Sequence, residues 1–517
     1  MTLPSDESRL FWLATLVVGA ITLIRIVVLI ATPLQLYPDE AQYWWWAQVP
    51  DWGYFSKPPL IAWIVWLTTR FSDGEWAIRI ASPLLHAGTA LIIFGIGRLA
   101  CDARVGFWSA LAYASLPGIS YSAGLISTDV PLLFCWAVAL YSFLRARGDE
   151  SWRWPLLCGV ALGLGMLAKY AMFYFLLSAT IAAVIDAPAR RLVLSLRGVA
   201  ILLLALLILS PNLLWNASHG YPTLVHTEAN ANWGHAKYNV ANASAFVAGQ
   251  FGVFGPLMML GWVAALWQLP RNNAGAPASR VLAAFSVPVL VLIVIQSFIS
   301  EANANWAAPA YVAAVPLAVA MLLQWWRSRL LWLSLGVGAL AMMALGAAQV
   351  SPSLADHAGF GNALKRQQGW RELGTVVAAE SRTASYDAIA ASNRSVLAEL
   401  LYYARPRAIP IKAWDRSTVP HDHFQMTMPL RAGTQRVLLV GAPDDTSAML
   451  ATFDSHELLR RLVIPLGHHH ERVLALYDAH FYRGPQPRRG SRASNARDVL
   501  GKSEPLGNAN APYIAKS

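Results

Sequence analysis

Charged residues are scarce in this sequence. They make up 13% of the 517 residues, whereas hydrophobic residues make up 56%. A soluble protein carries about 25% charged residues, so the composition argues against an ordinary soluble enzyme. Many apolar runs are long enough to cross a hydrocarbon core of about 30 Å. The scarcity of charge therefore predicts a polytopic α-helical membrane protein.

Cysteine is nearly absent as well. The only 3 cysteines, Cys101, Cys135 and Cys158, lie in or beside apolar segments. No disulfide framework and no CxxC metal site can be built from them. The sequence also lacks a P-loop and lacks a GxGxxG motif in a βαβ setting, so we predict no nucleotide site.

The formal net charge of +11 would suit a protein that binds nucleic acid. The arginines, however, occur in short clusters between apolar runs, which is the pattern of membrane topology rather than of a binding stripe. We therefore predict no nucleic-acid partner.

Windows of about 17 to 25 apolar residues mark the candidate membrane spans. The fifth and sixth windows are short and meet at Lys169 and Tyr170, so we expect about 11 to 13 transmembrane helices. The eleven windows are 10–31, 80–99, 105–121, 129–144, 154–169, 171–187, 198–215, 243–268, 281–299, 306–325 and 330–349.

The loops between these windows predict the topology. With a cytoplasmic N-terminus, every inner loop carries arginine, as the positive-inside rule demands. The start of the chain has no small-residue cleavage site after its apolar run, so we interpret it as a retained signal anchor. We therefore expect a multi-pass protein of the cell inner membrane. The arginines are Arg98, Arg104, Arg145, Arg147, Arg153, Arg190, Arg191, Arg197, Arg271, Arg280, Arg327 and Arg329.

The outer loops are long, aromatic and acidic, and they cover residues 32–79, 216–242 and 300–306. Tryptophan settles at headgroup depth, so we expect the first loop to lie along the outer leaflet as interfacial helices. A plain aromatic belt would explain these tryptophans equally well, but not the carboxylates and the lysine among them. The tryptophans are Trp44, Trp45, Trp46, Trp52, Trp63 and Trp66.

The composition changes to that of a soluble domain after the last window. We divide the chain into a transmembrane catalytic domain (1–350), a small periplasmic α/β domain (351–483) and a disordered tail (484–517). Within the second domain we predict helices at 368–380 and 394–405 and strands at 386–392 and 436–442, because helical and buried-strand patterns alternate there. The tail lacks apolar periodicity.

Carboxylates flank two spans at the outer face. Asp39 and Glu40 follow the first span, and Asp129 opens the fourth. Charged groups at a membrane edge usually have a partner or a task. Transfer of a group to a hydroxyl needs a carboxylate that accepts the hydroxyl proton, and we choose Asp39 for that base. Asp129 follows Ser127 and Thr128, so a helix N-cap is an alternative.

Two lysines occupy the same face. Lys57 precedes two prolines, and at headgroup level it is suited to bind a lipid phosphate as a point charge. Lys169 suits a second phosphate contact. The alternatives are snorkelling for Lys57 and a cation at a helix end for Lys169.

Histidines in the outer loop suggest a metal site, because imidazole and carboxylate are zinc ligands. Their spacing matches no HExxH-type motif, so we predict no metal. We interpret the histidine run in the α/β domain as surface residues for the same reason. The loop residues are His219, His226, Glu228 and His235, and the run is His468, His469 and His470.

Four short motifs together resemble the bacterial branch of the GT-C class of membrane glycosyltransferases. They are PDExxY (Pro38 to Tyr43), KPP at Lys57, STD at Asp129 and LAKY at Lys169. The branch includes protein O-mannosyltransferase-like and lipid A aminoarabinose transferase-like enzymes, families 39 and 83. The resemblance covers about residues 10 to 350.

The resemblance implies a GT-C fold and an inverting transfer from a polyprenyl-phosphate sugar. It implies that Asp39 and Asp129 line the active site, and we add the neighbouring Glu40 to this catalytic set. It places Lys57 on the donor phosphate, and the nearest match to a second phosphate ligand is Tyr311. No cofactor is implied.

The sequence departs from the pattern at two positions. Gln42 replaces an arginine, which alters recognition of an anionic or amino sugar, and Ser56 replaces a glutamate that is a candidate metal ligand. A metal-free site is therefore favoured. We place the following residues around the substrate: Tyr43, Gln42, His226 and Glu301.

The sequence thus predicts a transferase whose acceptor is lipid A, the lipopolysaccharide core or another envelope glycan. Protein O-glycosylation is an alternative acceptor class. A flippase or transporter for a polyprenyl-linked glycan is the rival function, because intramembrane charges also mark substrate paths. An anchoring protein with an inactive core is a third. We find no internal repeat of the kind that transporters often show.

Overall fold

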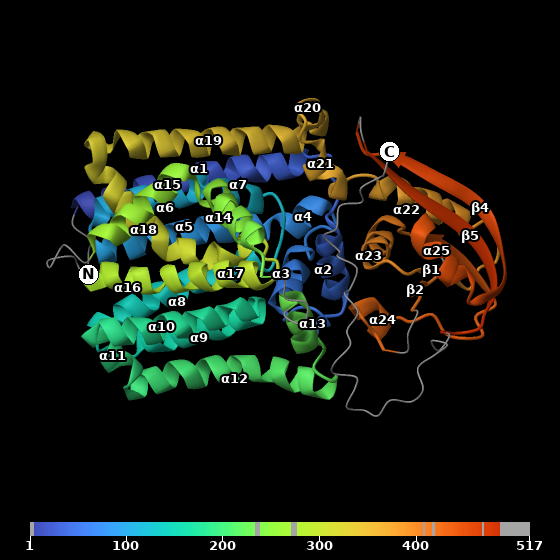
Figure 1. Ribbon diagram of the computed structural model, residues 1–517, viewed down its shortest axis with the longest axis horizontal. Helices are drawn as coiled ribbons and strands as arrows, with labels where there is room; N and C mark the ends of the chain where they lie inside the picture. The colour runs from blue at the N-terminus through green and yellow to red at the C-terminus, as the bar shows by residue number, and fades with distance from the viewer. Residues whose placement is uncertain are drawn as a thin grey trace.

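The computed structural model describes residues 5–232, 238–269, 277–406, 409–415, 419–467 and 470–485. Long helices lie side by side in a bundle, and a sheet domain lies beyond one end of it (Figure 1). The N-terminus is at the opposite end of the bundle from this domain. The short elements α2 (Pro38–Gln48), α3 (Leu60–Thr68), α4 (Glu75–Arg79) and α13 (Pro222–Ala231) lie between the bundle and the domain.

Each of the eleven predicted windows falls on helical residues. Among the described residues, seven helices are long and apolar enough to cross a membrane by length and composition, and one bent pair would be an eighth. The bundle helices are α1 (Ser5–Ala31), α5 (Ala81–Ala100), α6 (Ala103–Ser115), α7 (Pro117–Ser122), α8 (Asp129–Gly148), α9 (Arg153–Ala168), η1 (Tyr170–Met172), α10 (Phe173–Ile185), α11 (Ala187–Val193), α12 (Leu196–Ser218), α14 (Val240–Phe254), α15 (Pro256–Gln268), α16 (Pro277–Ala284), α17 (Val287–Ile299), η3 (Ala304–Ala307), α18 (Ala308–Gln324), η4 (Trp325–Ser328) and α19 (Arg329–Val350).

Three of the predicted windows are shorter than a full span. The window at 105–121 is divided into α6 and α7, and α9 and α10 are separated by a break at Lys169. Lys169 has an extended backbone, with φ −163° and ψ 134°, which ends α9. The pieces therefore reach only part of the membrane thickness by the rise of 1.5 Å per residue.

The window at 243–268, predicted as one span, is bent. Helices α14 and α15 meet at an angle of 106°. Gly255 lies between them with φ +89°, and Pro256 begins α15. A positive φ is open to glycine at little cost, and proline cannot continue the preceding helix. The apolar pattern runs through this bend, and the Gly255–Pro256 dipeptide is its signal in the sequence.

The C-terminal part is a five-stranded mixed sheet with helices, in the strand order β2-β1-β3-β5-β4. Strands β1, β2 and β3 are parallel neighbours, and β5 pairs antiparallel with both β3 and β4. The elements are α20 (Pro352–His357), α21 (Gly361–Leu364), η5 (Lys365–Gln367), α22 (Trp370–Glu380), β1 (Ala388–Ala391), α23 (Arg394–Tyr403), β2 (Ile411–Ala413), α24 (His423–Thr427), β3 (Arg436–Gly441), α25 (Pro443–Leu450), β4 (Phe453–Pro465) and β5 (Glu471–Tyr482).

The four elements predicted for this part are confirmed as α22, β1, α23 and β3. Strand β1 shows how they pack, because its side chains alternate between the two faces of the sheet. Ile389 and Ala391 belong to the core that contains α22 and α23, whereas Ala388 and Ala390 share a core with Met449 of α25. The long β4–β5 hairpin was not predicted. The predicted tail lies outside the described residues from position 486 on.

The first outer loop packs against this domain, and its expected placement along the leaflet stays a prediction. Trp44 and Trp46 are 4% and 1% exposed and share one hydrophobic core with α22, α23 and β1. Trp44 contacts the Tyr402 ring edge-on at 5.0 Å. Trp52 and Trp66 remain exposed at 48% and 36%. The central tryptophans of the loop are therefore buried against protein.

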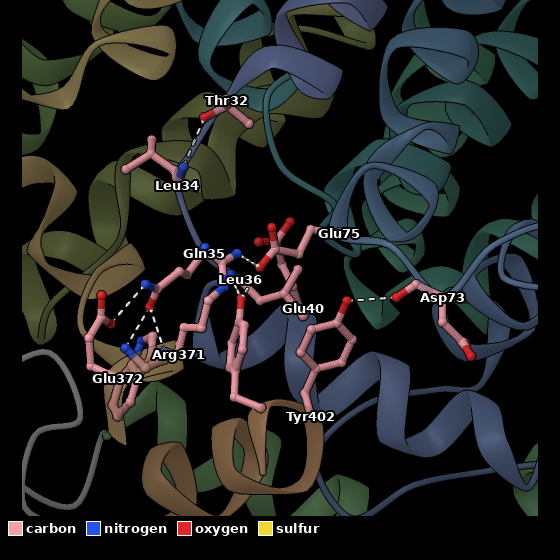
Figure 2. A network of polar contacts seen from close by, with 12 residues as sticks. Thr32, Leu34, Gln35, Leu36, Glu40, Asp73, Glu75, Arg371, Glu372 and Tyr402 are labelled. Atoms are coloured by element: carbon pink, nitrogen blue, oxygen red, sulfur yellow. Dashed lines mark hydrogen bonds and ion pairs between the residues drawn. The ribbon is translucent and has the colours of Figure 1, made fainter. Parts of the chain in front are cut away.

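Polar contacts hold the same junction together (Figure 2). The Gln35 amide donates to Glu372 at 3.1 Å, and its oxygen accepts from the backbone N–H of Arg371 at 3.1 Å. The Tyr402 hydroxyl donates to the Asp73 carbonyl at 2.7 Å. The first loop and the C-terminal part are thus joined by both apolar and polar contacts.

Candidate active site

Helix α2 presents Asp39 at its first turn. Pro38 begins the helix, where its missing N–H costs no hydrogen bond, and a carboxylate in the first turn is favoured by the helix dipole. The side chain of Asp39 is 40% exposed. It is therefore open to a substrate, as the predicted base must be.

Glu40, predicted as a catalytic group, has a structural position instead. Its carboxylate forms an ion pair with Arg79 at 2.7 Å and accepts from the backbone N–H groups of Tyr37 and Ile126, both at 2.9 Å. Both side chains of the pair are 1% exposed. Because both carboxylate oxygens are occupied and buried, Glu40 fixes α2 against α4 and the turn before α8 rather than contacting substrate.

Arg394, at the start of α23, reaches the predicted base from the C-terminal domain. Its Nη1 donates to the Asp39 carboxylate at 2.7 Å and to the Gln42 side-chain oxygen at 2.5 Å. Gln42 donates in turn to the Ser56 hydroxyl at 3.5 Å. The two positions that depart from the family pattern are therefore connected to each other and to an arginine from a distant part of the chain.

The charge of Arg394 controls the ionisation of Asp39. Burial raises the pKa of the Asp39 carboxyl, but the charge and hydrogen bond of Arg394, with a smaller contribution from Lys57, outweigh burial. The pKa of Asp39 therefore lies below its usual value. Asp39 is ionised at neutral pH and able to accept a proton.

Lys57 lies among the same groups with its ammonium unpaired. Among the described residues it has no hydrogen bond or ion pair from Nζ. Burial and the charge of Lys169 lower the pKa of Lys57, and the charges of Asp39 and Asp129 oppose this effect. A cation that is influenced by the charges of both carboxylates and has no partner is suited to bind an anionic ligand.

Asp129 and Lys169 form a closed pair. The Lys169 ammonium donates to one Asp129 oxygen at 2.7 Å, and the Asn305 amide donates to the other at 2.6 Å. The N-cap of α8 is Thr128, and no side chain caps this helix end. The alternative in which Asp129 serves as an N-cap is therefore wrong.

Two of the predicted substrate residues lie within reach of this charge cluster. Burial and then the charges of Lys57 and Arg394 lower the pKa of His226 to about 4, so its imidazole is neutral at pH 7. Burial and then the charge of Asp39 raise the pKa of the Tyr43 hydroxyl well above its usual value.

Tyr311 contacts other residues than those of this cluster. The Tyr311 hydroxyl donates to Gln250 at 2.5 Å, and its ring stacks on Phe254 at 4.3 Å inside the bundle core. Glu301 is exposed, and Asn305, four residues later, is the residue of this loop that reaches Asp129. The assignment of Tyr311 to the donor phosphate stays a prediction.

Within the described ranges, no group of three histidine, cysteine, aspartate or glutamate side chains is placed to hold a metal ion. His235 lies outside the described residues, as do His468 and His469. The predicted metal-free site stays a prediction.

Sequence reasoning missed Arg394 and Asn305. Asn305 lies in an outer loop that the topology had already directed to this face. Arg394 is separated from Asp39 by 355 positions and begins an amphipathic helix that resembles any surface helix of an α/β domain. Its signal was indirect: Gln42 stands where the family pattern has an arginine.

Comparison with known proteins identifies the family. Residues 56–215 match the family described as dolichyl-phosphate-mannose-protein mannosyltransferase. The lipid A galacturonosyltransferase RgtD of Rhizobium johnstonii is 31% identical over 466 residues, which is 89% of this chain and 97% of that protein. The chain belongs to the GT-C class of membrane glycosyltransferases. The predicted resemblance is confirmed.

A second relative and a solved structure also resemble the chain. The lipopolysaccharide core galacturonosyltransferase RgtA of the same organism is 28% identical over 205 residues, 39% of this chain and 41% of its own length. The crystal structure of ArnT from Cupriavidus metallidurans in the apo state aligns with a TM-score of 0.63 at 16% identity, over 90% of this chain and 97% of that one. At this identity the likeness supports the fold, and the predicted GT-C fold is confirmed.

Proposed function

We propose that this glycosyltransferase moves a uronic acid from a polyprenyl-phosphate donor to lipid A or the lipopolysaccharide core, at the periplasmic face. One observation carries the proposal: an ionised, partly exposed Asp39 lies beside the unpaired ammonium of Lys57. The two relatives reported above are named as galacturonosyltransferases acting on lipid A and on the lipopolysaccharide core, which supports this sugar and these acceptors.

The proposed reaction is a single displacement with inversion. The acceptor hydroxyl oxygen attacks the anomeric carbon and its proton passes to the Asp39 carboxylate. The bond between the anomeric carbon and the phosphate oxygen breaks, and its electron pair leaves with the polyprenyl phosphate. Lys57 stabilises the charge that gathers on this leaving group.

Asp129 and Lys169 have a supporting role in this proposal. Lys169 donates a hydrogen bond to Asp129, and Asn305 donates one to the same carboxylate. These hydrogen bonds keep the three side chains in place near Lys57. Lys169 offers its remaining N–H groups to the donor phosphate as a second contact, and Asp129 orients the sugar or the acceptor. No metal ion or cofactor takes part in the proposed reaction.

The proposed location is the inner membrane of a cell with an outer envelope. The arginine-bearing loops support a cytoplasmic N-terminus by the positive-inside rule. The elements around Asp39 lie at the end of the bundle that faces the sheet domain, away from the N-terminus (Figure 1). Both features support a periplasmic site and a periplasmic C-terminal domain.

The test is a glycolipid profile of membranes by mass spectrometry. Cells would carry the intact gene, a deletion or Asp39→Asn. We expect lipid A or core species to lose one uronic acid mass in both mutants, because the variant lacks the base. If Asp39→Asn matches the intact gene while the deletion changes the distribution of glycolipids between leaflets, the flippase alternative replaces this proposal. If a glycan disappears from periplasmic proteins instead, the acceptor is protein.

A further inference from the structure

The guanidinium of Arg394 is only partly used. Its Nη1 makes both of its hydrogen bonds, to Asp39 and Gln42. Among the described residues, Nη2 and Nε donate to no partner, and the side chain is 33% exposed. Arginine has five N–H donors in a rigid fork that matches a carboxylate with two parallel hydrogen bonds. One edge of this fork is therefore available to a ligand beside the catalytic base.

The backbone that carries this guanidinium is fixed by packing, and Asp39 and Gln42 hold the guanidinium itself. Asn393 caps α23, accepting from the backbone N–H of Ser395 at 2.8 Å. The next turns of α23 share a hydrophobic core with α2, which carries both Asp39 and Gln42. A guanidinium at the capped end of a packed helix is preorganised, so it recognises a ligand at a low cost in side-chain entropy.

Two cationic groups with unused donors thus flank Asp39. One is the ammonium of Lys57, and the other is the open edge of Arg394. Lys169 also keeps N–H donors, but its printed contact is with Asp129 and not with Asp39. A uronic acid carried on a polyprenyl phosphate has two separate anionic groups, the phosphate and the sugar carboxylate. A neutral sugar has the phosphate alone and would leave one of the two cations without a ligand.

We propose that Arg394 is the specificity residue that binds the carboxylate of the uronic acid, and that this contact releases Asp39 to act as the base. The proposal rests on the proposed function, because it assigns the sugar-recognising group of the same site. It gives the C-terminal domain a direct part in choosing the donor.

The release of Asp39 follows from competition for one cation. The sugar carboxylate binds the open edge of the guanidinium, formed by Nε and Nη2, and neutralises the charge that Asp39 otherwise balances alone. With the ion pair weakened, Asp39 becomes a stronger proton acceptor when the correct donor is bound. A neutral sugar leaves Asp39 tied to Arg394, so it reacts slowly even when it binds. Discrimination therefore acts on kcat as well as on KM.

The experiment compares two donors on the full-length purified protein. The donors are polyprenyl-phosphate galacturonic acid and polyprenyl-phosphate galactose, with lipid A as acceptor. The proteins are the intact chain, Arg394→Gln and Arg394→Lys. Arg382→Gln is the matched control, because Arg382 is an exposed arginine of the same domain.

We expect Arg394→Gln to lower kcat/KM for the uronic acid donor by about 10- to 100-fold, as for the loss of a charge-assisted hydrogen bond. Transfer of galactose should stay equal or rise, because Asp39 is no longer held. Arg394→Lys keeps the charge without the fork. Its kcat/KM for the uronic acid donor should lie between those of the intact chain and Arg394→Gln. Arg382→Gln should keep the donor ratio of the intact chain.

Equal loss for both donors in Arg394→Gln would overturn the proposal, because a purely structural arginine would affect them alike. If Arg394→Gln does not fold, as judged by its melting temperature, Arg394→Lys serves as the test. The measured quantity is the ratio of kcat/KM for the uronic acid donor to kcat/KM for the galactose donor. An unchanged ratio overturns the proposal, and a reduced ratio supports it. If the intact chain transfers neither sugar, the proposed function itself has failed.

Discussion

At the scale of single residues, two adjacent carboxylates of α2 differ in exposure and in partner. Asp39 is 40% exposed and paired with a partly exposed arginine, whereas Glu40 is 1% exposed and paired with the equally buried Arg79. Helix geometry explains the difference, because neighbouring residues point about 100° apart around the axis. One carboxylate faces the site and the other faces the protein interior.

The ionisation of Asp39 predicts a pH dependence. The pKa of Asp39 is lowered, so its ion pair with Arg394 stabilises the fold above the unfolded-state pKa and is lost as pH falls through the folded-state pKa. The acid limb of the pH profile of kcat/KM should therefore lie below the ordinary carboxylate range. Arg394→Gln should move that limb to higher pH. An acid limb that does not move would show that another group is the base.

Glu40→Gln should act on stability. Removing one charge from a buried pair leaves the other uncompensated, at a cost of about 3 to 5 kcal/mol. We expect a lower melting temperature in detergent. Glu7→Gln is the control, because Glu7 pairs with Arg98 at 3.3 Å on a partly exposed surface and should change the melting temperature little. Equal effects of the two variants would contradict the structural role of Glu40.

At the scale of elements, helix packing in the bundle depends on close backbone approach. A Cβ at Gly338 of α19 would meet the Ser115 carbonyl oxygen of α6 at 2.4 Å, whereas a Cβ at Gly336 would meet nothing within 4 Å. Small residues allow this approach between membrane helices. The two glycines, half a turn apart, therefore have different roles.

Gly338→Ala should separate α19 from α6 and destabilise the protein by about 1 to 3 kcal/mol, the cost of overpacking. Gly336→Ala should be neutral or slightly stabilising, because alanine favours the helix by about 1 kcal/mol. Thermal unfolding of the two purified variants measures the difference. A drop of similar size in both would contradict the packing of α19 on α6.

The elements also show which features of the fold could be predicted from the sequence. Local periodicity was enough to predict the membrane windows and four elements of the C-terminal part, which are α22, β1, α23 and β3. The influence of both Asp39 and Asp129 on Lys57 agrees with their predicted placement at the outer ends of spans. The bend at Gly255 was missed, because the windows count apolar residues alone, although the Gly255–Pro256 dipeptide is a signal for a helix break. The position of Arg394 beside Asp39 could not be predicted, because it depends on how the whole C-terminal domain packs on α2.

At the scale of the whole molecule, the first outer loop and the C-terminal domain share one core. Trp44 and Trp46 are buried there, and Gln35 bonds to α22 (Figure 2). The C-terminal domain is therefore a part of the candidate site, since α23 supplies Arg394 while α2 supplies Asp39. The bundle end that carries the site must face the same compartment as the sheet domain.

This arrangement predicts the result of thiol labelling on spheroplasts. Phe360, 70% exposed after α20, is expected in the periplasm, whereas the native and exposed Cys101 is expected in a cytoplasmic loop. A membrane-impermeant thiol reagent should label Phe360→Cys on intact spheroplasts and should label Cys101 only after permeabilisation. Labelling of Cys101 before permeabilisation would reverse the proposed topology.

The most direct test of the whole account is transfer by the purified protein from a polyprenyl-phosphate uronic acid to lipid A. The account predicts a product heavier by one uronic acid, release of polyprenyl phosphate in equal amount, and a rate for Asp39→Asn lower by about 10²- to 10⁴-fold. The melting temperature of Asp39→Asn should fall only slightly, since its ion pair with Arg394 is partly exposed and contributes about 1 kcal/mol at most. Transfer by Asp39→Asn at the rate of the intact chain would contradict the account.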